Sequence, residues 1–277
     1  MVMSNKPRYV FFGTPEFAAV ILEELCVAGM PPIAVVTNPD RPQGRKKIIM
    51  PSAVKRKFII HDSGCKILQP EKLDEAFIDE LKSLNAEVGV LVAYGKIIPH
   101  VVFDVFSKGI VVVHPSLLPK YRGATPIQSA ILAGEDITGT TLFVMDEKID
   151  HGPVLGSAQV PLLDMDTYST LADKLAEASA VALLEILPQY LADKIITVPQ
   201  SEVGVTYTKK FVGEDGRVDL EKDEAVTVWR KVRALNPEPS VWTIKDGKRM
   251  KIVDAVLVDG KLVLRKVQFD GGKSHAV

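Results

Sequence analysis

Short apolar segments that alternate with amphipathic ones constrain the fold of this chain more than any other feature. Val88–Tyr94 and Ile110–Val113 consist mostly of aliphatic residues, which is typical of strands buried on both faces of a parallel sheet. Elsewhere apolar residues recur at helical spacing, as at Phe17, Ile21 and Leu25. Strands separated by helices predict an α/β domain with a mainly parallel sheet covered on both faces.

Further segments fit the same alternation. Strands are predicted at residues 9–12, 32–37, 140–145 and 158–160, and helices from Pro15 onward, at 75–81 and over 167–194. Pro188 is expected to kink or break the last helix, because proline lacks a backbone N–H and its ring clashes with the preceding turn.

The pattern changes after Pro199. A helix is predicted over residues 223–235, and short strands follow it. The dipeptides Asp246-Gly247, Asp259-Gly260 and Asp270-Gly271 separate these strands and are typical of tight hairpin turns. We therefore predict two domains, residues 1–204 and 205–277, of which the second is a compact barrel.

Composition indicates an enzyme of the cytoplasm rather than a secreted or membrane protein. The chain has 277 residues, of which 47% are hydrophobic and 25% charged. Its first residues lack the apolar stretch of a signal peptide, and no apolar run reaches the length of a membrane span. Cys26 and Cys65 are too few for a disulfide framework and show no metal-ligand spacing, so we expect no metal.

His114 stands at the point where the apolar run Ile110–Val113 stops. Pro115 follows it, and proline cannot continue a central strand. Open α/β sheets bind their ligands beyond the carboxyl ends of their strands. His114 is therefore predicted to face a ligand site, although a structural histidine at a turn is the alternative.

Three segments resemble the folate-dependent formyltransferase family. They are Gly13–Phe17 (GTPEF), His114–Gly123 (HPSLLPKYRG) and Asp150–Pro153 (DHGP), and the resemblance extends over nearly the whole chain. It implies a Rossmann-like catalytic domain, a small OB-like C-terminal β-barrel and 10-formyltetrahydrofolate as co-substrate. The chain is most similar to members that formylate initiator methionyl-tRNA, which implies a role in translation initiation.

The reaction that this resemblance implies needs two kinds of group. An amine attacks the formyl carbon, so the carbonyl oxygen gains negative charge while the nitrogen must lose a proton. We expect His114 to donate to that oxygen, and Asp150 to pair with His114 and assist proton transfer. Without the resemblance, Asp150 would equally fit an ordinary loop carboxylate.

Val112 is the principal departure from the family's pattern. The family carries an asparagine two residues before the histidine, and its amide helps to hold and polarise the formyl group. A valine offers no donor, but it suits a strand well. We therefore expect an intact fold with impaired formyl transfer.

The folate pocket is predicted at the end of the strand Val88–Tyr94, where an apolar strand opens to Gly95. Lys96, Ile97 and Ile98 are expected to form one wall. The family resemblance adds the residues that border the folate, which are Ser116, Leu117, Leu118 and Pro119. Gly13 and Thr14 are expected to border the amino-acid end of the substrate, although a strand-to-helix turn without a ligand is the commoner role of such a pair.

Basic residues are concentrated in two places although the net charge is −1. Residues 205–277 contain 15 Lys and Arg and 11 Asp and Glu, a formal charge of +4. Residues 40–57 contain seven Lys or Arg and one Asp. The segment from Pro39 resembles the PDRPxGR loop with which family members reach the acceptor end of the tRNA, and it predicts tRNA contacts by Arg41, Arg45, Lys46 and Lys47.

Three functions remain open at this stage. The first is formylation of initiator methionyl-tRNA by a monomeric enzyme. The second is formyl transfer to a small amine such as a sugar nucleotide, or hydrolysis of formyl-folate. The third is binding of folate or tRNA without catalysis, which Val112 keeps open.

Overall fold

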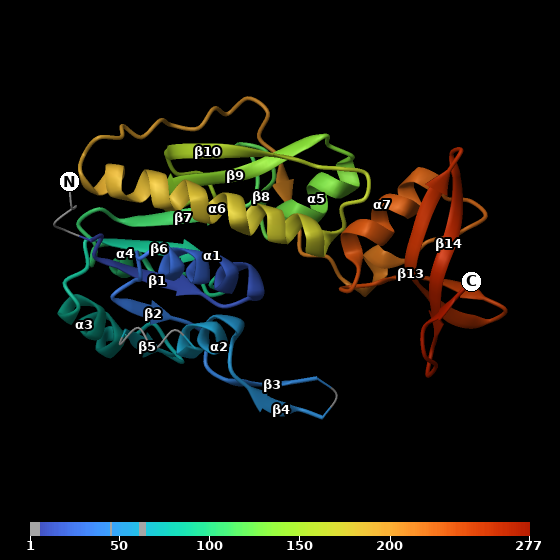
Figure 1. The fold of residues 1–277 in the computed structure, drawn as a ribbon, viewed down its shortest axis with the longest axis horizontal. Helices are drawn as coiled ribbons and strands as arrows, with labels where there is room; N and C mark the ends of the chain where they lie inside the picture. The colour runs from blue at the N-terminus through green and yellow to red at the C-terminus, as the bar shows by residue number, and fades with distance from the viewer. Residues whose placement is uncertain (1–5, 45, 61–64) are drawn as a thin grey trace. The chain divides into compact units, whose positions relative to one another are not determined.

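A computed structural model describes residues 6–44, 46–60 and 65–277 of the chain (Figure 1). The chain divides into two compact units. The first contains residues 1–119, 139–160 and 173–203, and the second contains residues 120–138, 161–172 and 204–277. Two segments before residue 204 therefore belong to the second unit, and a division into domains 1–204 and 205–277 stays a prediction.

A seven-stranded sheet carries the first unit, in the order β10-β9-β7-β6-β1-β2-β5. Strands β1, β2, β5, β6 and β7 are parallel, and β9 is antiparallel to β7. The strands are β1 (Tyr9–Gly13), β2 (Ala34–Val36), β5 (Lys66–Leu68), β6 (Val88–Val92), β7 (Ile110–His114), β9 (Ile137–Val144) and β10 (Val154–Pro161). The predicted mainly parallel sheet is thereby confirmed.

Alternate side chains of the strands pack into two hydrophobic cores, one on each face of the sheet. Tyr9 and Phe11 of β1 join the core beneath helices α1, α2 and α6, whereas Val10 and Phe12 join the core beneath α3 and α4 (Figure 1). The helices are α1 (Glu16–Val27), α2 (Ala53–Ile60), α3 (Glu75–Ser83), α4 (His100–Phe103) and α6 (Tyr168–Leu191). Both faces are therefore covered, as the apolar strands require.

The second unit contains a small antiparallel sheet of β12 (Val241–Lys245), β13 (Lys248–Val258), β14 (Lys261–Phe269) and β15 (His275–Ala276), paired in that order. Helix α7 (Ala225–Leu235) packs on this sheet and against α5 (Pro126–Ala133). The unit also contains the parallel pair β8 (Arg122–Gly123) and β11 (Tyr207–Thr208) and the 3₁₀ turn η1 (Gly213–Gly216). The predicted C-terminal antiparallel β domain is confirmed, as an open meander within the described residues.

The predicted hairpin turns agree with the structure, whereas the predicted break of α6 at Pro188 does not. Asp246 and Gly247 both have positive φ, as do Asp259 and Gly260, which two-residue hairpin turns require. Pro188 was expected to kink or break α6, and the break is wrong, because α6 continues through Pro188 to Leu191. The apolar residues of α6 before Pro188 are packed in the core, and this packing outweighs one lost hydrogen bond.

Gly139 of β9 leaves no room for a side chain. A methyl group there would lie 2.2 Å from the carbonyl oxygen of Ala158 and 2.5 Å from Cδ2 of Leu117. We expect Gly139→Ala to lower the free energy of unfolding by about 1–3 kcal/mol, as overpacking does elsewhere. Urea denaturation measures this change. Gly213→Ala is the matched control, since its methyl group would meet open space, and equal midpoints for the two variants would contradict this packing.

Candidate active site

Strand β7 carries Val112 and His114 on the same face, because side chains two residues apart in a strand point to the same side. Val112 lies opposite Leu91 of β6 and Phe143 of β9, and its side chain belongs to the core beneath α3 and α4. His114 ends β7 opposite Thr141, and its side chain is only 6% exposed. The predicted oxyanion donor and the valine in the family's asparagine position therefore face the same region.

Asp150 lies beside His114. The distance from Nδ1 of His114 to Oδ2 of Asp150 is 3.6 Å, and the Asp150 side chain is 20% exposed. The backbone of Asp150 has a φ of +48°, in the left-handed region that few residues other than glycine adopt. The pair is thus largely withdrawn from water. Opposite charges attract each other more strongly in such surroundings than in water.

Residues 145–152 form the loop that brings Asp150 to this position. The loop leaves β9 next to the start of β7, where the N–H of Met145 donates to the carbonyl of Ile110 at 2.8 Å. Asp150 reaches the opposite end of β7, at His114. The loop consequently crosses the face of the sheet that carries Val112.

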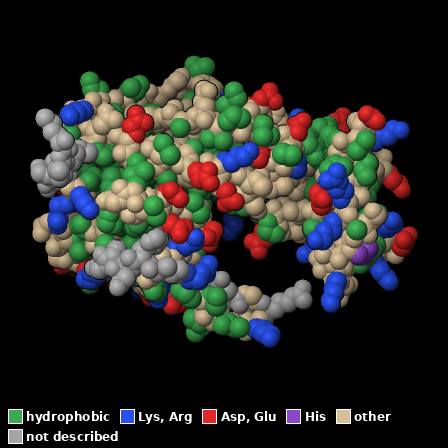
Figure 2. All heavy atoms as spheres, in the orientation of Figure 1, with side chains coloured by type: hydrophobic (Ala, Val, Ile, Leu, Met, Phe, Trp, Pro, Cys, Tyr) green, Lys and Arg blue, Asp and Glu red, His purple; other side chains and the backbone are tan. Residues whose placement is uncertain are grey.

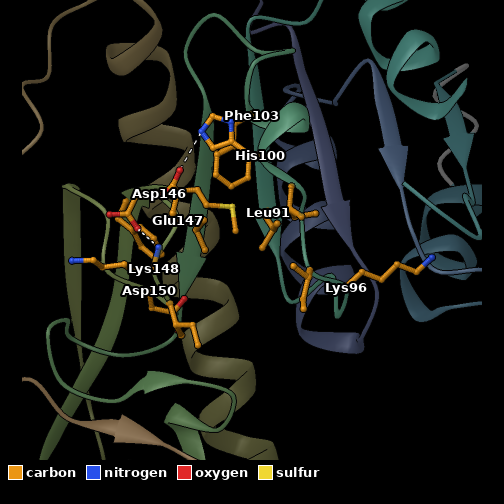
Figure 3. Close-up of a pocket in the computed structure, with 14 residues that line it drawn as sticks. Leu91, Lys96, His100, Phe103, Asp146, Glu147, Lys148 and Asp150 are labelled. Carbon is orange, nitrogen blue, oxygen red and sulfur yellow. Dashed lines mark hydrogen bonds and ion pairs between the residues drawn. The ribbon is translucent and has the colours of Figure 1, made fainter. Parts of the chain in front are cut away.

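A cavity of about 420 Å³ lies between this loop and the ends of β6 and β7 (Figure 3). Most of its wall is apolar, and its polar groups come chiefly from the loop. The lining residues are Leu91, Lys96, Ile97, Ile98, His100, Phe103, Val112, Phe143 and residues 145–150. An apolar wall with a few polar groups on one side is typical of a site for a small, flat molecule.

The three residues predicted for one wall of the folate pocket line the cavity, but the Lys96 side chain turns away from it. Lys96, Ile97 and Ile98 are all part of the wall. The ammonium of Lys96, however, donates to the carbonyls of Pro70 and Glu71 at 2.6 and 3.0 Å, and its side chain extends away from the cavity in Figure 3. Lys96 therefore contributes its backbone and the base of its side chain to the wall.

The tetrapeptide Ser116, Leu117, Leu118 and Pro119 does not line this cavity. Ser116 is fully buried, and its carbonyl accepts a hydrogen bond from the Thr141 hydroxyl at 2.7 Å. The N–H of Leu118 donates to the same hydroxyl at 3.1 Å. These bonds fix the turn after His114, and contact of the tetrapeptide with folate stays a prediction.

Gly13 and Thr14 lie at the carboxyl ends of β1 and β6. The Thr14 hydroxyl donates to the carbonyl of Tyr94 at 2.9 Å, and the Asn38 amide donates to the same carbonyl at 3.0 Å. Burial raises the pKa of Tyr94 to about 12, so its phenol stays protonated near neutral pH and is excluded as a general base. The predicted contact of Gly13 and Thr14 with substrate remains a prediction.

The basic segment forms a hairpin of β3 (Arg41–Gln43) and β4 (Ile48–Met50) that projects from the sheet (Figure 1). Arg41 is exposed and pairs with Glu71 at 2.5 Å. Lys46 and Lys47 are exposed at the turn and make no ion pair within the described part of the chain. Arg45, also predicted to contact tRNA, lies outside the described residues.

The hairpin also exposes an apolar strand. Ile48 and Ile49 are 57% and 68% exposed, and Figure 2 shows apolar side chains beside basic ones on this projection. At its base, Asp40 accepts hydrogen bonds from Gln69 and Lys55, and these bonds lower the pKa of its carboxyl. The base of the hairpin is thus held by hydrogen bonds of Asp40 with Lys55 and Gln69.

Residues 6–44, 46–60 and 65–277 contain no group of three or more His, Cys, Asp or Glu side chains placed to hold a metal ion. Within the same ranges, every helix is too short or too polar to cross a membrane.

The sequence matches known protein families over most of its length. Residues 7–187 match the formyl transferase family, and residues 210–264 match the formyl transferase C-terminal domain. The chain belongs to the formyl transferase family. It is therefore a transferase, and the resemblance carried by the three short segments is confirmed.

Several methionyl-tRNA formyltransferases are about 40% identical to the chain over most of its length. The methionyl-tRNA formyltransferase of Methylococcus capsulatus is 44% identical over 253 residues, which cover 91% of this chain and 81% of the relative. The methionyl-tRNA formyltransferase of Lachnospira eligens is 42% identical over 253 residues, covering 91% and 79%.

A solved structure shows the same fold at lower sequence identity. HypX from Aquifex aeolicus, in complex with tetrahydrofolic acid, superposes with a TM-score of 0.68 at 18% identity. The superposition covers 98% of this chain and 46% of HypX, so the chain spans about half of that protein. At this identity the likeness shows the fold alone.

Several cavity residues escaped prediction from the sequence. Phe103, Phe143 and Met145 line the cavity, yet they stand in two separate segments with no shared motif. Two of them lie in the strand predicted at 140–145, but the sequence alone did not indicate which strand lies next to it. Only the antiparallel pairing of β7 with β9 places Phe143 opposite Val112.

Proposed function

We propose that this chain transfers the formyl group of 10-formyltetrahydrofolate to the amino group of initiator methionyl-tRNA. The observation that carries the proposal is the pairing of His114 with Asp150 beside an apolar cavity, in a chain whose relatives are methionyl-tRNA formyltransferases. The pterin of the folate occupies the cavity, against Ile98 and the loop 145–150. Its formyl group then lies next to Val112 and His114.

The reaction forms one bond and breaks one. The amine nitrogen attacks the formyl carbon, and the carbonyl oxygen gains the negative charge that His114 stabilises by donating a hydrogen bond. Asp150 holds the imidazole and accepts the proton that the amine loses. Collapse of the intermediate breaks the bond to N10, which receives the proton that Asp150 had accepted, so that tetrahydrofolate leaves and the carboxylate is restored.

Val112 lacks the amide donor that the family's asparagine would present at this position. Its side chain lines the cavity and faces the same region as His114, so an amide in its place would reach the formyl oxygen. We therefore propose that the chain binds its substrates and turns them over slowly. The remaining folate contacts, through Ser116 to Pro119, and the substrate contacts of Gly13 and Thr14 belong to the same proposal.

The tRNA contacts are assigned to the hairpin and to the basic second domain. The hairpin contacts the acceptor end of the tRNA through Arg41, Arg45, Lys46 and Lys47. Residues 1–204 form the catalytic domain, and residues 205–277 form a separate domain that binds another part of the tRNA. The Arg41–Glu71 ion pair does not oppose this role, because exposed pairs contribute little and are readily exchanged for phosphate. The enzyme acts as a cytoplasmic monomer.

Removing the charges at the hairpin turn should weaken tRNA binding in a salt-dependent way. We expect Lys46→Ala combined with Lys47→Ala to reduce the slope of log K against log salt concentration by about 1–2, since each lost phosphate contact releases about one counterion fewer. Filter binding at several salt concentrations measures this slope. Lys57→Ala is the control, because Lys57 pairs with Glu23, and identical slopes for both variants would remove the hairpin from the tRNA interface.

A formylation assay separates the candidate functions. The purified chain is incubated with 10-formyltetrahydrofolate and initiator methionyl-tRNA, and N-formylmethionine is counted after hydrolysis of the ester. Slow formation of the product supports the proposal. Transfer to sugar-nucleotide amines without RNA supports the small-amine function, and binding of folate or tRNA with no product in the presence of excess enzyme supports a binding protein.

A further inference from the structure

Residues 195–203, which follow α6, are bonded to the strand and loop next to Asp150. Val198 forms an antiparallel bridge with Val154, with N–H to carbonyl distances of 2.7 and 2.8 Å. Gln200 and Glu202, further along the segment, contact the loop itself. All of these residues belong to the first unit.

Gln200 makes the most specific of these contacts. Its Nε2 donates to the carbonyl of Asp150 and to the carbonyl of Gly152, both at 2.9 Å. The two hydrogens of one amide nitrogen therefore bond to the carbonyls on either side of His151. A donor pair of this kind fixes the orientation of the peptide units through which Asp150 is attached.

A second contact acts on the residue between these carbonyls. His151 lies 2.6 Å from Asp146 through Nδ1 and 3.4 Å from Glu202 through Nε2. Glu202 is 72% exposed, so this ion pair contributes little by itself. Gln200 thus bonds directly to the backbone of the loop, whereas Asp146 and Glu202 act on the His151 side chain.

The conformation of Asp150 explains why such a hold is needed. Its φ of +48° is unfavourable for a residue with a side chain. If the backbone of Asp150 relaxed to a negative φ, we expect its carboxylate to turn away from His114, from which it is now separated by 3.6 Å. Backbone bonds from a neighbouring segment are a direct way to keep a strained residue in place.

We propose that Gln200 is a positioning residue for formyl transfer, which keeps the carboxylate of Asp150 next to His114. This inference rests on the proposed role of Asp150 in the reaction. Gln200 is not among the residues that line the cavity, and it acts through its hydrogen bonds to the backbone of Asp150 and Gly152.

Gln200→Glu tests the proposal, because a carboxylate of the same size cannot donate to either carbonyl. We expect kcat to fall about 10- to 100-fold, as misplacing a catalytic group by about 1 Å does. The KM values for folate and tRNA should change little, since the lost interaction serves the transition state. Gln189→Glu is the matched control, because the Gln189 amide likewise donates to the backbone, at the carbonyl of Glu185 on α6. An unchanged kcat in Gln200→Glu would overturn the proposal.

A double-mutant cycle separates positioning from a merely structural role. In the Asp150→Asn background, Gln200→Glu should cause almost no further loss, because the group that it positions has already been disabled. A loss by the same factor in both backgrounds would mean that Gln200 acts independently of Asp150. That result would also overturn the proposal.

Hydrogen exchange of the backbone amides of residues 146–152 gives a readout that does not depend on activity. We expect faster exchange in Gln200→Glu than in Gln189→Glu or the unmodified chain. If no variant transfers a formyl group, the proposed function has failed, and this measurement still decides the inference about Gln200. Faster exchange supports its hold on the loop, and unchanged exchange refutes it.

Discussion

Val112→Asn should raise the rate of formyl transfer by about 10²–10³, because loss of one oxyanion donor in other enzymes lowers the rate by that factor. Val112 lines the cavity and lies two residues before His114 on the same strand face. An asparagine there presents its amide to the formyl oxygen as negative charge develops on it. Single-turnover formylation of initiator methionyl-tRNA, with enzyme in excess, measures the rate of this step.

Val112→Leu is the control for this substitution, since it changes the shape of the site without adding a donor. We expect it to leave the rate at or below that of the unmodified chain. Thermal unfolding of all three proteins shows whether the fold is retained. A small loss of stability is expected in Val112→Asn, because the substitution places a polar amide at a buried position. Equal formylation rates for Val112→Asn and the unmodified chain would refute the role assigned to this position.

Asp150→Asn should lower the rate by about 10²–10⁴ in the Val112→Asn background, the range over which general acid–base groups contribute. The substitution keeps the size of the side chain but removes the negative charge beside His114. His114→Asn should cause a loss of similar size. The combination of both should cost little more than either alone, because the two side chains act as one pair.

His275→Asn provides the comparison for these variants. His275 lies on the exposed strand β15, and its replacement should leave the rate unchanged. Losses in Asp150→Asn that appear only in KM, with kcat intact, would mean that Asp150 binds substrate without taking part in the chemical step. Full additivity of the His114 and Asp150 variants would contradict their action as a pair.

The sequence predicted the elements that carry the site better than the way in which they meet. The run Ile110–Val113 reads as a buried strand because its residues are aliphatic on both faces, and β7 is buried along its whole length. The position of His114 at the end of this strand could be predicted because Pro115 cannot continue a central strand. The position of Asp150, in contrast, depends on the path of a loop that crosses the sheet, and no local pattern encodes that path.

The hairpin β3–β4 shows a similar limit. Its basic residues were visible in the sequence, but Arg41 and Met50 were not predicted to pair across a turn. Pro42 within a strand argues against a central position, and the structure places it in a two-stranded ribbon. Gln200 escaped prediction altogether, because its partners are backbone carbonyls and leave no signal in the side chains around it.

A crystal structure of the chain with 5-formyltetrahydrofolate, the stable isomer of the proposed co-substrate, tests the central claim most directly. We expect the pterin in the cavity between β6 and the loop 145–150, with N10, the nitrogen that carries the formyl group in the co-substrate, facing His114 and Asp150. Folate bound elsewhere, or bound in this cavity with N10 pointing away from both side chains, would contradict the account.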